Sequence, residues 1–234
     1  WGVGATEYAN LVHSGFTMVE VPEAIRFELV GTLAETVTAK DVMLHILLHF
    51  AKPQKTLDRN LEFGGPGLQS LSMDERATLA NMVTECTARS GVCEGDEETV
   101  RWICARRPEL KPEAVRARLV APDPGAHYDG GVHTIDLAAL EPMVAHPGDP
   151  DRGIPSDPTN GELVARLGEV KIDIAYGGSC TGGKKVDMDL YASVVQKARD
   201  KNLALADGVR LYIQFGSQRI RDYAETMGYV QLFE

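Results

Sequence analysis

Hydrophobic and polar residues alternate in three short segments of the chain, which predicts strands there. Residues 25–33 (IRFELVGTL) place their first apolar side chains on one side, while Arg26 and Glu28 point to the other. This period of two is typical of a half-buried strand. Residues 171–176 (KIDIAY) and 210–215 (RLYIQF) carry the same pattern over a shorter length.

Apolar residues at helical spacing predict the helices, and capping residues mark where several of them begin. Thr38 and Asp96 are good N-caps, because their side chains accept hydrogen bonds from the free N–H groups of a first helical turn. Ser72 and Glu75 form the S-x-x-E pattern of a capping box. Gly91 is expected at the C′ position that ends the helix opened by Ser72. The predicted helices span residues 3–13, 39–51, 73–90, 97–106, 186–201 and 218–227.

The order of these elements predicts an α/β fold with mostly parallel sheets. In the second half of the chain, a strand, a glycine-containing loop and a helix follow one another twice, an order that produces parallel strands covered by helices. Residues 142–160 are rich in proline, glycine and aspartate and are expected to form an exposed loop. Two compact units are therefore expected, joined within residues 108–140.

The charge of the chain argues against two classes of function. It has 24 basic and 34 acidic residues, a formal net charge of −10 and a pI near 5.1. Such a surface repels phosphate backbones and anionic lipids, so binding to nucleic acid or to a membrane is not expected. No apolar run approaches the length of a membrane span, and no signal peptide is expected.

The four cysteines are Cys86, Cys93, Cys104 and Cys180, and no two of them have the C-x₂-C spacing of a zinc or redox site. The first three fall in or beside predicted helices, where a buried or partly buried thiol is the commonest arrangement. Cysteine usage of this kind indicates a reducing compartment, and a cytoplasmic location is expected.

The glycine-rich residues 178–185 (GSCTGGKK), between a predicted strand and a predicted helix, are the strongest candidate for chemistry. Free N–H groups and the positive end of a helix dipole stabilise anions and thiolates at such a place. Three interpretations stay open from the residues alone: Cys180 as a ligand of a metal or iron–sulfur centre, a degenerate phosphate-binding loop, and a small buried thiol in a tight turn. The phosphate loop is disfavoured, because Lys185 stands where a hydroxyl would hold Mg²⁺.

Short motifs run through most of the chain in a fixed order. They are WGVGATEYA, PEAIRFELVGTL, VTAKDVML, EFGGPG, SMDERATLANMVTE, AHYDGGVHTIDLAALEP, GSCT and GSQRIRDYAETMGY. In this order they resemble the aconitase superfamily of iron–sulfur hydro-lyases, which includes aconitase, homoaconitase and the large subunit of isopropylmalate dehydratase. The resemblance implies three-layer α/β/α aconitase-like domains. It also implies a piece of a longer protein, because Trp1 stands inside the first motif.

The resemblance assigns roles to three residues. In the family, the cysteine of the GSCT motif ligates a [4Fe–4S] cluster, and that position is Cys180 here. Asn81 and Glu85 match an Asn and a Glu that lie near the labile iron of the cluster, and they are expected on one face of the helix predicted over residues 73–90. Gly182 departs from the family, which usually has Asn there, and this departure bears on the substrate more than on the cluster.

The resemblance further implies a domain plan. Residues 1–20 would end a preceding aconitase-like domain, residues 21–140 would form a second α/β domain, and residues 141–234 would form the first part of a third, cluster-binding domain. The general base, a serine in the family, would lie on a swivel domain or a small subunit outside these residues. The arginines that clamp the carboxylates of the substrate would lie outside them as well.

The reaction that the resemblance implies is dehydration and rehydration of a small hydroxy acid, with an open iron site acting as a Lewis acid on the substrate hydroxyl. The aconitase or homoaconitase type is the first choice, and the large subunit of isopropylmalate dehydratase is the alternative. An RNA-binding aconitase-like module is a further alternative, which the charge of −10 disfavours. Cys180 is the only cysteine at a matching position, so this chain alone is expected to hold no intact cluster and to be inactive.

Overall fold

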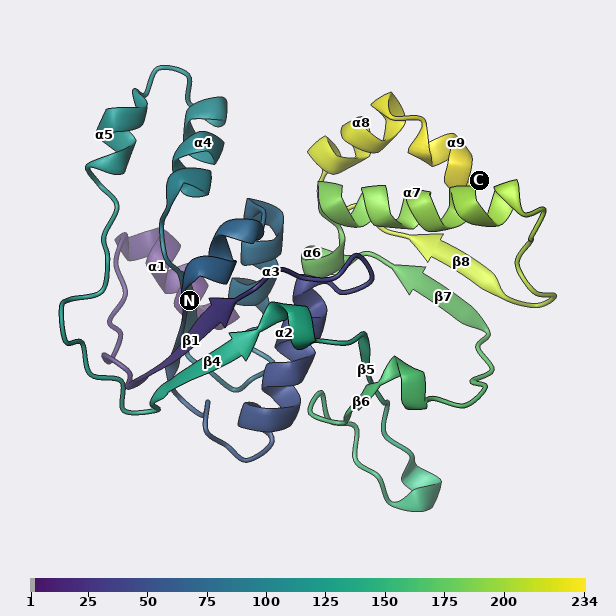
Figure 1. Cartoon of the computed structure of the whole chain (residues 1–234), viewed down its shortest axis with the longest axis horizontal. Helices are drawn as coiled ribbons and strands as arrows, with labels where there is room; N and C mark the ends of the chain where they lie inside the picture. The colour runs from purple at the N-terminus through teal and green to yellow at the C-terminus, as the bar shows by residue number, and fades with distance from the viewer. Residues whose placement is uncertain (1–2) are drawn as a thin grey trace. The chain divides into compact units, whose positions relative to one another are not determined.

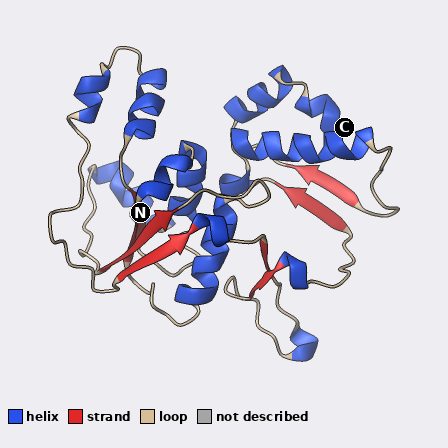
Figure 2. Cartoon of the chain, in the orientation of Figure 1, coloured by secondary structure: helices blue, strands red, loops and turns tan. Residues whose placement is uncertain are grey.

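The structure is a computed structural model that describes residues 3–234. Contacts within the chain divide it into two compact units, one ending at Arg166 and one running from Leu167 to Glu234. The sheets of the two units are separate (Figure 2). The division falls later in the chain than the junction expected within residues 108–140, because residues 132–136 join the sheet of the first unit.

A four-stranded parallel sheet organises the first unit, and its strands β1 (Ala24–Val30) and β4 (Val132–Asp136) are visible in Figure 1. Its order is β3-β2-β1-β4, and every neighbouring pair is parallel, as expected for an α/β fold. The strands are β1 (Ala24–Val30), β2 (Asn60–Gly64), β3 (Ser90–Cys93), β4 (Val132–Asp136), and a separate antiparallel pair β5 (Met143–Ala145) and β6 (Gly161–Leu163). The helices are α1 (Ala5–Ser14), α2 (Ala39–Ile46), α3 (Met73–Met82), α4 (Glu97–Arg106) and α5 (Pro112–Arg116). Short 3₁₀ or π turns are η1 (Leu47–Ala51), η2 (Pro66–Ser70), η3 (Leu137–Ala139), η4 (Pro150–Arg152) and η5 (Val164–Arg166).

One face of the four-stranded sheet forms the hydrophobic core of the first unit. Phe27 and Phe63, from neighbouring strands, are fully buried, and their stacked rings have centroids 5.8 Å apart. Phe50 meets Phe27 edge-on, with centroids 5.0 Å apart. Burial of each large apolar side chain stabilises the fold by roughly 1.5–3 kcal/mol. The helices add four fully buried side chains to this core, Val42, Met43 and Ile46 from α2 and Leu79 from α3.

The opposite face of this sheet carries a charged cluster centred on Arg26. The guanidinium lies 2.5 Å from Glu28, 2.7 Å from Glu94 and 3.9 Å from Glu62. The hydroxyl of Tyr128 donates to Glu62 at 3.0 Å. Burial opposes the charge of Arg26, but its hydrogen bonds with Glu28 and Glu94 outweigh burial and raise the pKa of Arg26 above its ordinary value. The alternation of the sequence is thus confirmed, with apolar residues on one face and paired charges on the other.

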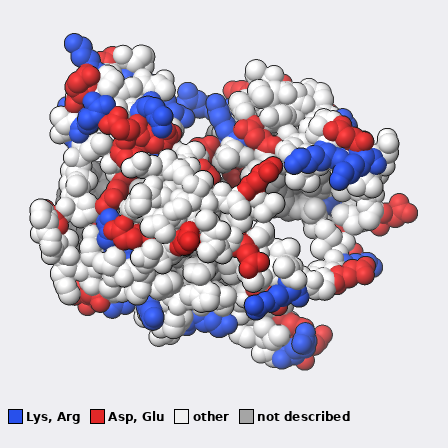
Figure 3. Space-filling model, in the orientation of Figure 1, with Lys and Arg blue, Asp and Glu red and all other residues white. Residues whose placement is uncertain are grey.

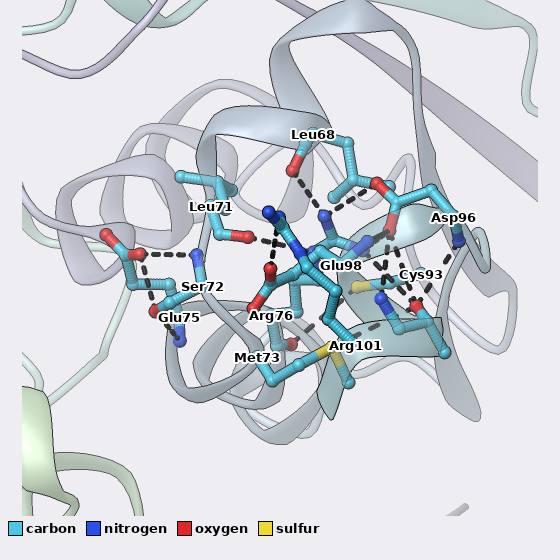
Figure 4. A network of polar contacts seen from close by, with 11 residues as sticks. Leu68, Leu71, Ser72, Met73, Glu75, Arg76, Cys93, Asp96, Glu98 and Arg101 are labelled. Atoms are coloured by element: carbon cyan, nitrogen blue, oxygen red, sulfur yellow. Dashed lines mark hydrogen bonds and ion pairs between the residues drawn. The ribbon is translucent and has the colours of Figure 1, made fainter. Parts of the chain in front are cut away.

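A second ion pair fixes the start of α4 against α3 (Figure 4). Both terminal nitrogens of Arg76, a side chain only 2% exposed, donate to the carboxylate of Asp96 at 2.7 Å. Arg76 also donates to the carbonyl oxygens of Leu68 and Leu71, at 2.9 and 3.0 Å. Asp96 accepts hydrogen bonds from the backbone N–H groups of the first turn of α4, so the predicted N-cap is confirmed. Burial opposes ionisation of Asp96, but the hydrogen bonds from Arg76 and the helix hold its pKa below the ordinary value.

The helix predicted over residues 73–90 ends at Met82, and a run of turns follows it. The predicted C′ role of Gly91 is therefore wrong, because Gly91 lies in β3. A Cβ at Gly91 would lie 2.6 Å from Cγ1 of Val83 and 3.2 Å from Cα of Ala80. Gly91 lets β3 lie close to the chain at the end of α3, and it does not terminate a helix.

The breaker-rich residues 142–160 form a loop only in part. Their first residues belong to β5, and the N–H of Met143 donates to the buried carboxylate of Asp41 at 2.7 Å. Residues 150–156 are all exposed, as expected for a segment rich in proline and glycine. The β5-β6 pair packs against α2 and so belongs to the first unit.

The second unit is a two-stranded parallel sheet with helices on one side of it (Figure 1). The parallel pairing confirms the order of elements read from the sequence. The strands are β7 (Ile174–Gly177) and β8 (Arg210–Ile213). The helices are the one-turn α6 (Ser179–Gly182), α7 (Lys185–Asp200), α8 (Gln218–Thr226) and α9 (Tyr229–Phe233), the last three of which pack against one another.

Basic and acidic side chains lie next to one another over the face shown in Figure 3. Several are paired, as on α4 and α5, where Arg101 contacts Glu98 and Arg116 contacts Glu97, each at 2.6 Å. Within residues 3–234, none of the helices has the length and apolar character needed to cross a membrane.

Candidate functional site

Cys180 lies at the edge where the sheet of the second unit presents the carboxyl ends of its strands. It is the second residue of α6, which stands between β7 and α7. Its side chain is exposed. α/β proteins gather ligands at this edge of a parallel sheet. The placement agrees with the turn between a parallel strand and a helix that the sequence predicts.

The backbone just before Cys180 has an unusual conformation. Gly178 has a φ of 147° and Ser179 a φ of 86°, a region that residues other than glycine rarely adopt. Oγ of Ser179 accepts hydrogen bonds from the N–H groups of Thr181 and Gly182, both at 3.2 Å. Strain of this kind costs about 1–3 kcal/mol and persists only where the surrounding structure holds it. The turn that carries Cys180 is therefore held in one shape.

The loop that follows β8 packs directly on this turn. The N–H of Gly216 donates to the carbonyl oxygen of Gly183 at 2.9 Å. A Cβ on Gly183 would lie 2.6 Å from that nitrogen, and a Cβ on Gly178 would lie 2.6 Å from Cβ of Gln214. Two backbones this close leave no room for side chains, which explains the glycines on both sides of the cysteine.

Two side chains that the sequence analysis did not single out also hold the turn. The ammonium group of Lys184 donates to the carbonyl oxygen of Thr181 and lies 3.7 Å from Asp187. The hydroxyl of Tyr191, on α7, donates to the carbonyl oxygen of Gly182 at 3.0 Å. Helical side chains point back toward the N-terminus of their helix, and this rule is the signal that places Tyr191 over the turn before α7.

Asn81 and Glu85 lie in the first unit, and both are exposed. Asn81 belongs to the last turn of α3, whereas Glu85 lies in the turns beyond Met82. The common helical face expected for them is therefore wrong, because the chain leaves the helix to enter β3. The expectation that both side chains serve the same cleft as Cys180 stays a prediction.

The thiols of Cys86 and Cys93 have raised pKa values. Burial, with a smaller contribution from the charge of Glu85, raises the pKa of Cys86 to about 12. Burial likewise raises the pKa of Cys93 to about 12, against the opposing effect of Arg76. Such thiols stay protonated at neutral pH and are poor metal ligands, because the thiolate is the form that binds.

Cys180 fits one position of a metal centre but not a whole ligand set. Among residues 3–234, no three His, Cys, Asp or Glu side chains gather where they could hold a metal ion. An exposed thiol in a restrained turn is a suitable single ligand for a larger centre.

Comparison with known proteins supplies the context for this arrangement. The family model described as the aconitase family (aconitate hydratase) matches residues 1–234. The chain belongs to the aconitase family. This membership confirms the resemblance carried by the ordered motifs, and the mostly parallel α/β architecture agrees with it.

Curated relatives in the aconitase family are longer than this chain. It is 33% identical over 232 residues to the 3-isopropylmalate dehydratase large subunit of Lachnoclostridium phytofermentans, and 34% identical over 233 residues to that of Clostridium kluyveri. It is 30% identical over 231 residues to the protein of the same name from Sulfurimonas denitrificans. Each alignment covers 99% of this chain and 50–51% of the relative. The chain thus spans about half the length of the curated relatives it matches.

Family membership bears on the three interpretations of residues 178–185. The aconitase family implies an iron–sulfur cluster, which favours Cys180 as a cluster ligand. The phosphate-loop interpretation is weakened further by Lys184, whose ammonium group is engaged within the turn itself. The exposure of Cys180 disagrees with the interpretation as a buried thiol.

Proposed function

We propose that this chain is part of an iron–sulfur hydro-lyase that interconverts isomeric hydroxy acids by removing and re-adding water. The observation that carries the proposal is the placement of Cys180. In a chain of the aconitase family, the cysteine of the GSCT motif stands exposed in a restrained turn at the carboxyl edge of a parallel sheet.

In this proposal Cys180 supplies one thiolate ligand of a [4Fe–4S] cluster. The hydrogen bonds of Ser179 and the close contact with Gly216 hold the backbone of the turn before the ligand binds, so little conformational freedom is lost on binding. When bound, such a cluster supplies a Lewis-acidic iron that assists departure of a hydroxyl group.

Asn81 and Glu85 are proposed to act on the substrate or on its water. An amide group donates hydrogen bonds to carboxylate oxygens, and a carboxylate accepts and returns a proton. Both side chains are exposed at the end of α3, which the buried Arg76–Asp96 pair anchors to α4. That anchoring supports a defined position for Asn81.

The domain plan is part of the same proposal. Residues 1–20 end one domain, residues 21–140 form a second, and residues 141–234 begin a third that binds the cluster. Within residues 141–234, β5 and β6 belong to the first unit and β5 packs against α2, so we further propose that the part that folds as an independent cluster-binding unit begins near Leu167.

The substrate is proposed to be a hydroxy dicarboxylate or tricarboxylate. The sequence favours the aconitase or homoaconitase type, whereas the relatives quoted above carry the name of the alternative, 3-isopropylmalate dehydratase large subunit. Their name also supports a partner: a small subunit, or a swivel domain, that carries the general base. Free thiols support a reducing compartment, and the cytoplasm is proposed.

The test uses the intact protein that contains this chain, together with its small subunit or swivel domain. Visible absorption measures the cluster, and ultraviolet absorption of the unsaturated acid measures turnover on a panel of hydroxy dicarboxylates and tricarboxylates. Cys180→Ser is expected to lose the cluster signal and turnover, while the matched control Cys104→Ser keeps both. A Cys180→Ser protein with an unchanged cluster would contradict the proposal. The best substrate of the panel decides between the aconitase or homoaconitase type and isopropylmalate dehydratase.

A further inference from the structure

The phenol of Tyr191 touches both ends of the turn that carries Cys180. Its hydroxyl donates to the carbonyl oxygen of Gly182 at 3.0 Å. The same phenol oxygen accepts a hydrogen bond from the backbone N–H of Gly178. One hydroxyl group therefore bridges the residue that starts the turn and the residue that ends it, with Cys180 between them.

The ring of Tyr191 adds a packing contact to this bridge. A Cβ on Gly177 would lie 3.1 Å from the Cε2 and Cζ atoms of the ring, so the ring lies against the backbone where β7 ends. Tyr191 is half-buried and comes from the second turn of α7. The 16-residue helix α7 is a rigid base for the side chain, because it packs on both α8 and α9.

The turn needs such a restraint because its backbone is strained. Ser179, the residue before the cysteine, has a φ of 86°. The side chain of Ser179 accepts hydrogen bonds from two N–H groups inside the turn, those of Thr181 and Gly182. Local bonds of this kind shape the turn but do not tie it to the rest of the unit. Contacts that do tie it come from Gly216, from Tyr191, and from Lys184, whose ammonium group also lies 3.7 Å from Asp187 of α7.

We propose that Tyr191 is a positioning residue for Cys180: its hydroxyl closes the turn from Gly178 to Gly182 and fixes the backbone that carries the thiol. This inference rests on the proposed role of Cys180 as a cluster ligand.

The first measurement is hydrogen exchange of the amides in residues 178–184 of the full chain. Tyr191→Phe removes the hydroxyl and keeps the ring against Gly177, so the unit stays folded. Loss of two hydrogen bonds predicts exchange about tenfold faster in this segment. Tyr223→Phe is the matched control, because it removes a phenol hydroxyl on α8 that donates to Asp189 of α7 at 2.7 Å. The control is expected to leave the segment unchanged.

The second measurement is the rate at which a chelator bleaches the cluster absorption in the intact reconstituted protein. Tyr191→Phe is expected to bleach about fivefold to tenfold faster than the natural protein, and Tyr223→Phe at the natural rate. Faster exchange and faster bleaching together support the positioning role. Either change without the other, or neither, overturns it.

A third variant separates this inference from the proposed function. If Cys180→Ser loads and keeps the cluster as the natural protein does, the proposed role of Cys180 fails, and the positioning role fails with it. If Cys180→Ser loses the cluster while Tyr191→Phe matches the natural protein in both measurements, the proposed function stands and only the role of Tyr191 is overturned.

Discussion

At the scale of single residues, the cysteines form two classes, of which the first, Cys86 and Cys93, has a pKa raised by desolvation. Cys86 is fully buried, and burial raises its pKa to about 12, as it does for Cys93. Cys180 is exposed at the carboxyl edge of a sheet, and Cys104 is partly exposed on α4. A thiol in the first class is a small apolar side chain, while a thiol in the second is open to a reagent or a metal.

We expect alkylation by iodoacetamide at pH 8 to follow this division. With a pKa near 12, only about one thiol in ten thousand is ionised at this pH, and the thiolate is the reacting form. Cys180 and Cys104 should therefore react at least about tenfold faster than Cys86 and Cys93. Peptide mass spectrometry measures each rate, and the protein unfolded in urea, where all four should react alike, is the control. Rapid labelling of Cys86 in the folded protein would contradict the assigned burial.

At the scale of elements, the parts of the fold that depend on neighbours in sequence could be predicted. α4 spans Glu97–Arg106 as predicted, because Asp96 caps it through local hydrogen bonds. The end of α3 could not be predicted, because it is set by the pairing of β3 with β2, a contact between distant segments. Gly91 looks like a helix terminator in the sequence, and only the packing of β3 on α3 shows its real role.

The role of Gly91 leads to a prediction about stability. In Gly91→Ala the new Cβ would overlap Cγ1 of Val83, which lies 2.6 Å from its position, so the strand must shift. We expect the free energy of unfolding to fall by about 1–3 kcal/mol, measured by urea denaturation. Gly168→Ala is the matched control, since no atom lies within 4 Å of a Cβ there, and it should change little. Equal stability of the two variants would contradict the close packing of β3 on α3.

The Arg76–Asp96 pair leads to a second prediction at this scale. Asp96→Asn leaves the buried guanidinium of Arg76 without its charged partner, so we expect the free energy of unfolding to fall by about 3 kcal/mol at pH 7. Urea denaturation followed by tryptophan fluorescence, to which Trp102 on α4 contributes, measures the change. The control is Glu97→Gln, which removes an exposed partner of Arg116 and should have little effect.

The pH dependence of the Asp96→Asn effect follows from the lowered pKa of Asp96. The folded state holds the carboxylate ionised at a pH where the unfolded chain already binds a proton. The stabilisation is therefore complete above the ordinary Asp pKa, near 4, and is lost as the pH falls through the lower folded value. The difference between Asp96→Asn and the natural protein should shrink below pH 4. A difference that stays constant down to pH 2 would show that the ion pair is not its cause.

At the scale of the whole molecule, the position of the candidate site could be predicted from the sequence, but the contacts that shape it could not. The GSCT motif placed Cys180 between a parallel strand and a helix, and the structure has it there. The partners of the turn could not be predicted, because Gly216 comes from another loop and Tyr191 from the second turn of α7. The expected common face of Asn81 and Glu85 failed for the same physical reason, since tertiary pairing ended α3 at Met82.

The last prediction concerns this chain produced by itself, which we expect to hold no intact [4Fe–4S] cluster and to show no hydro-lyase turnover. A cubane cluster needs three or four protein thiolates, and Cys180 alone stands at a matching position. Cys86 and Cys93 stay protonated at neutral pH, and no group of three metal-binding side chains exists among residues 3–234. In such a reaction the electrophile, the general base and the orientation of the substrate each lower the activation barrier by roughly several kcal/mol. A chain without the cluster, the base and the carboxylate-binding arginines should therefore give no detectable rate.

Anaerobic reconstitution of the purified chain with iron and sulfide, followed by visible absorption and hydration assays on aconitate and related acids, tests this expectation. The intact protein that contains this chain, treated in the same batch together with its small subunit or swivel domain, is the positive control. A stable cubane signal in this chain would contradict the expectation and show that other thiols of the chain join Cys180 at the cluster. The buried Cys86 and the partly buried Cys93 are candidates for these thiols, and Cys86→Ala and Cys93→Ala would test them. Loss of the signal in either variant would mean that the first unit opens to release a thiol.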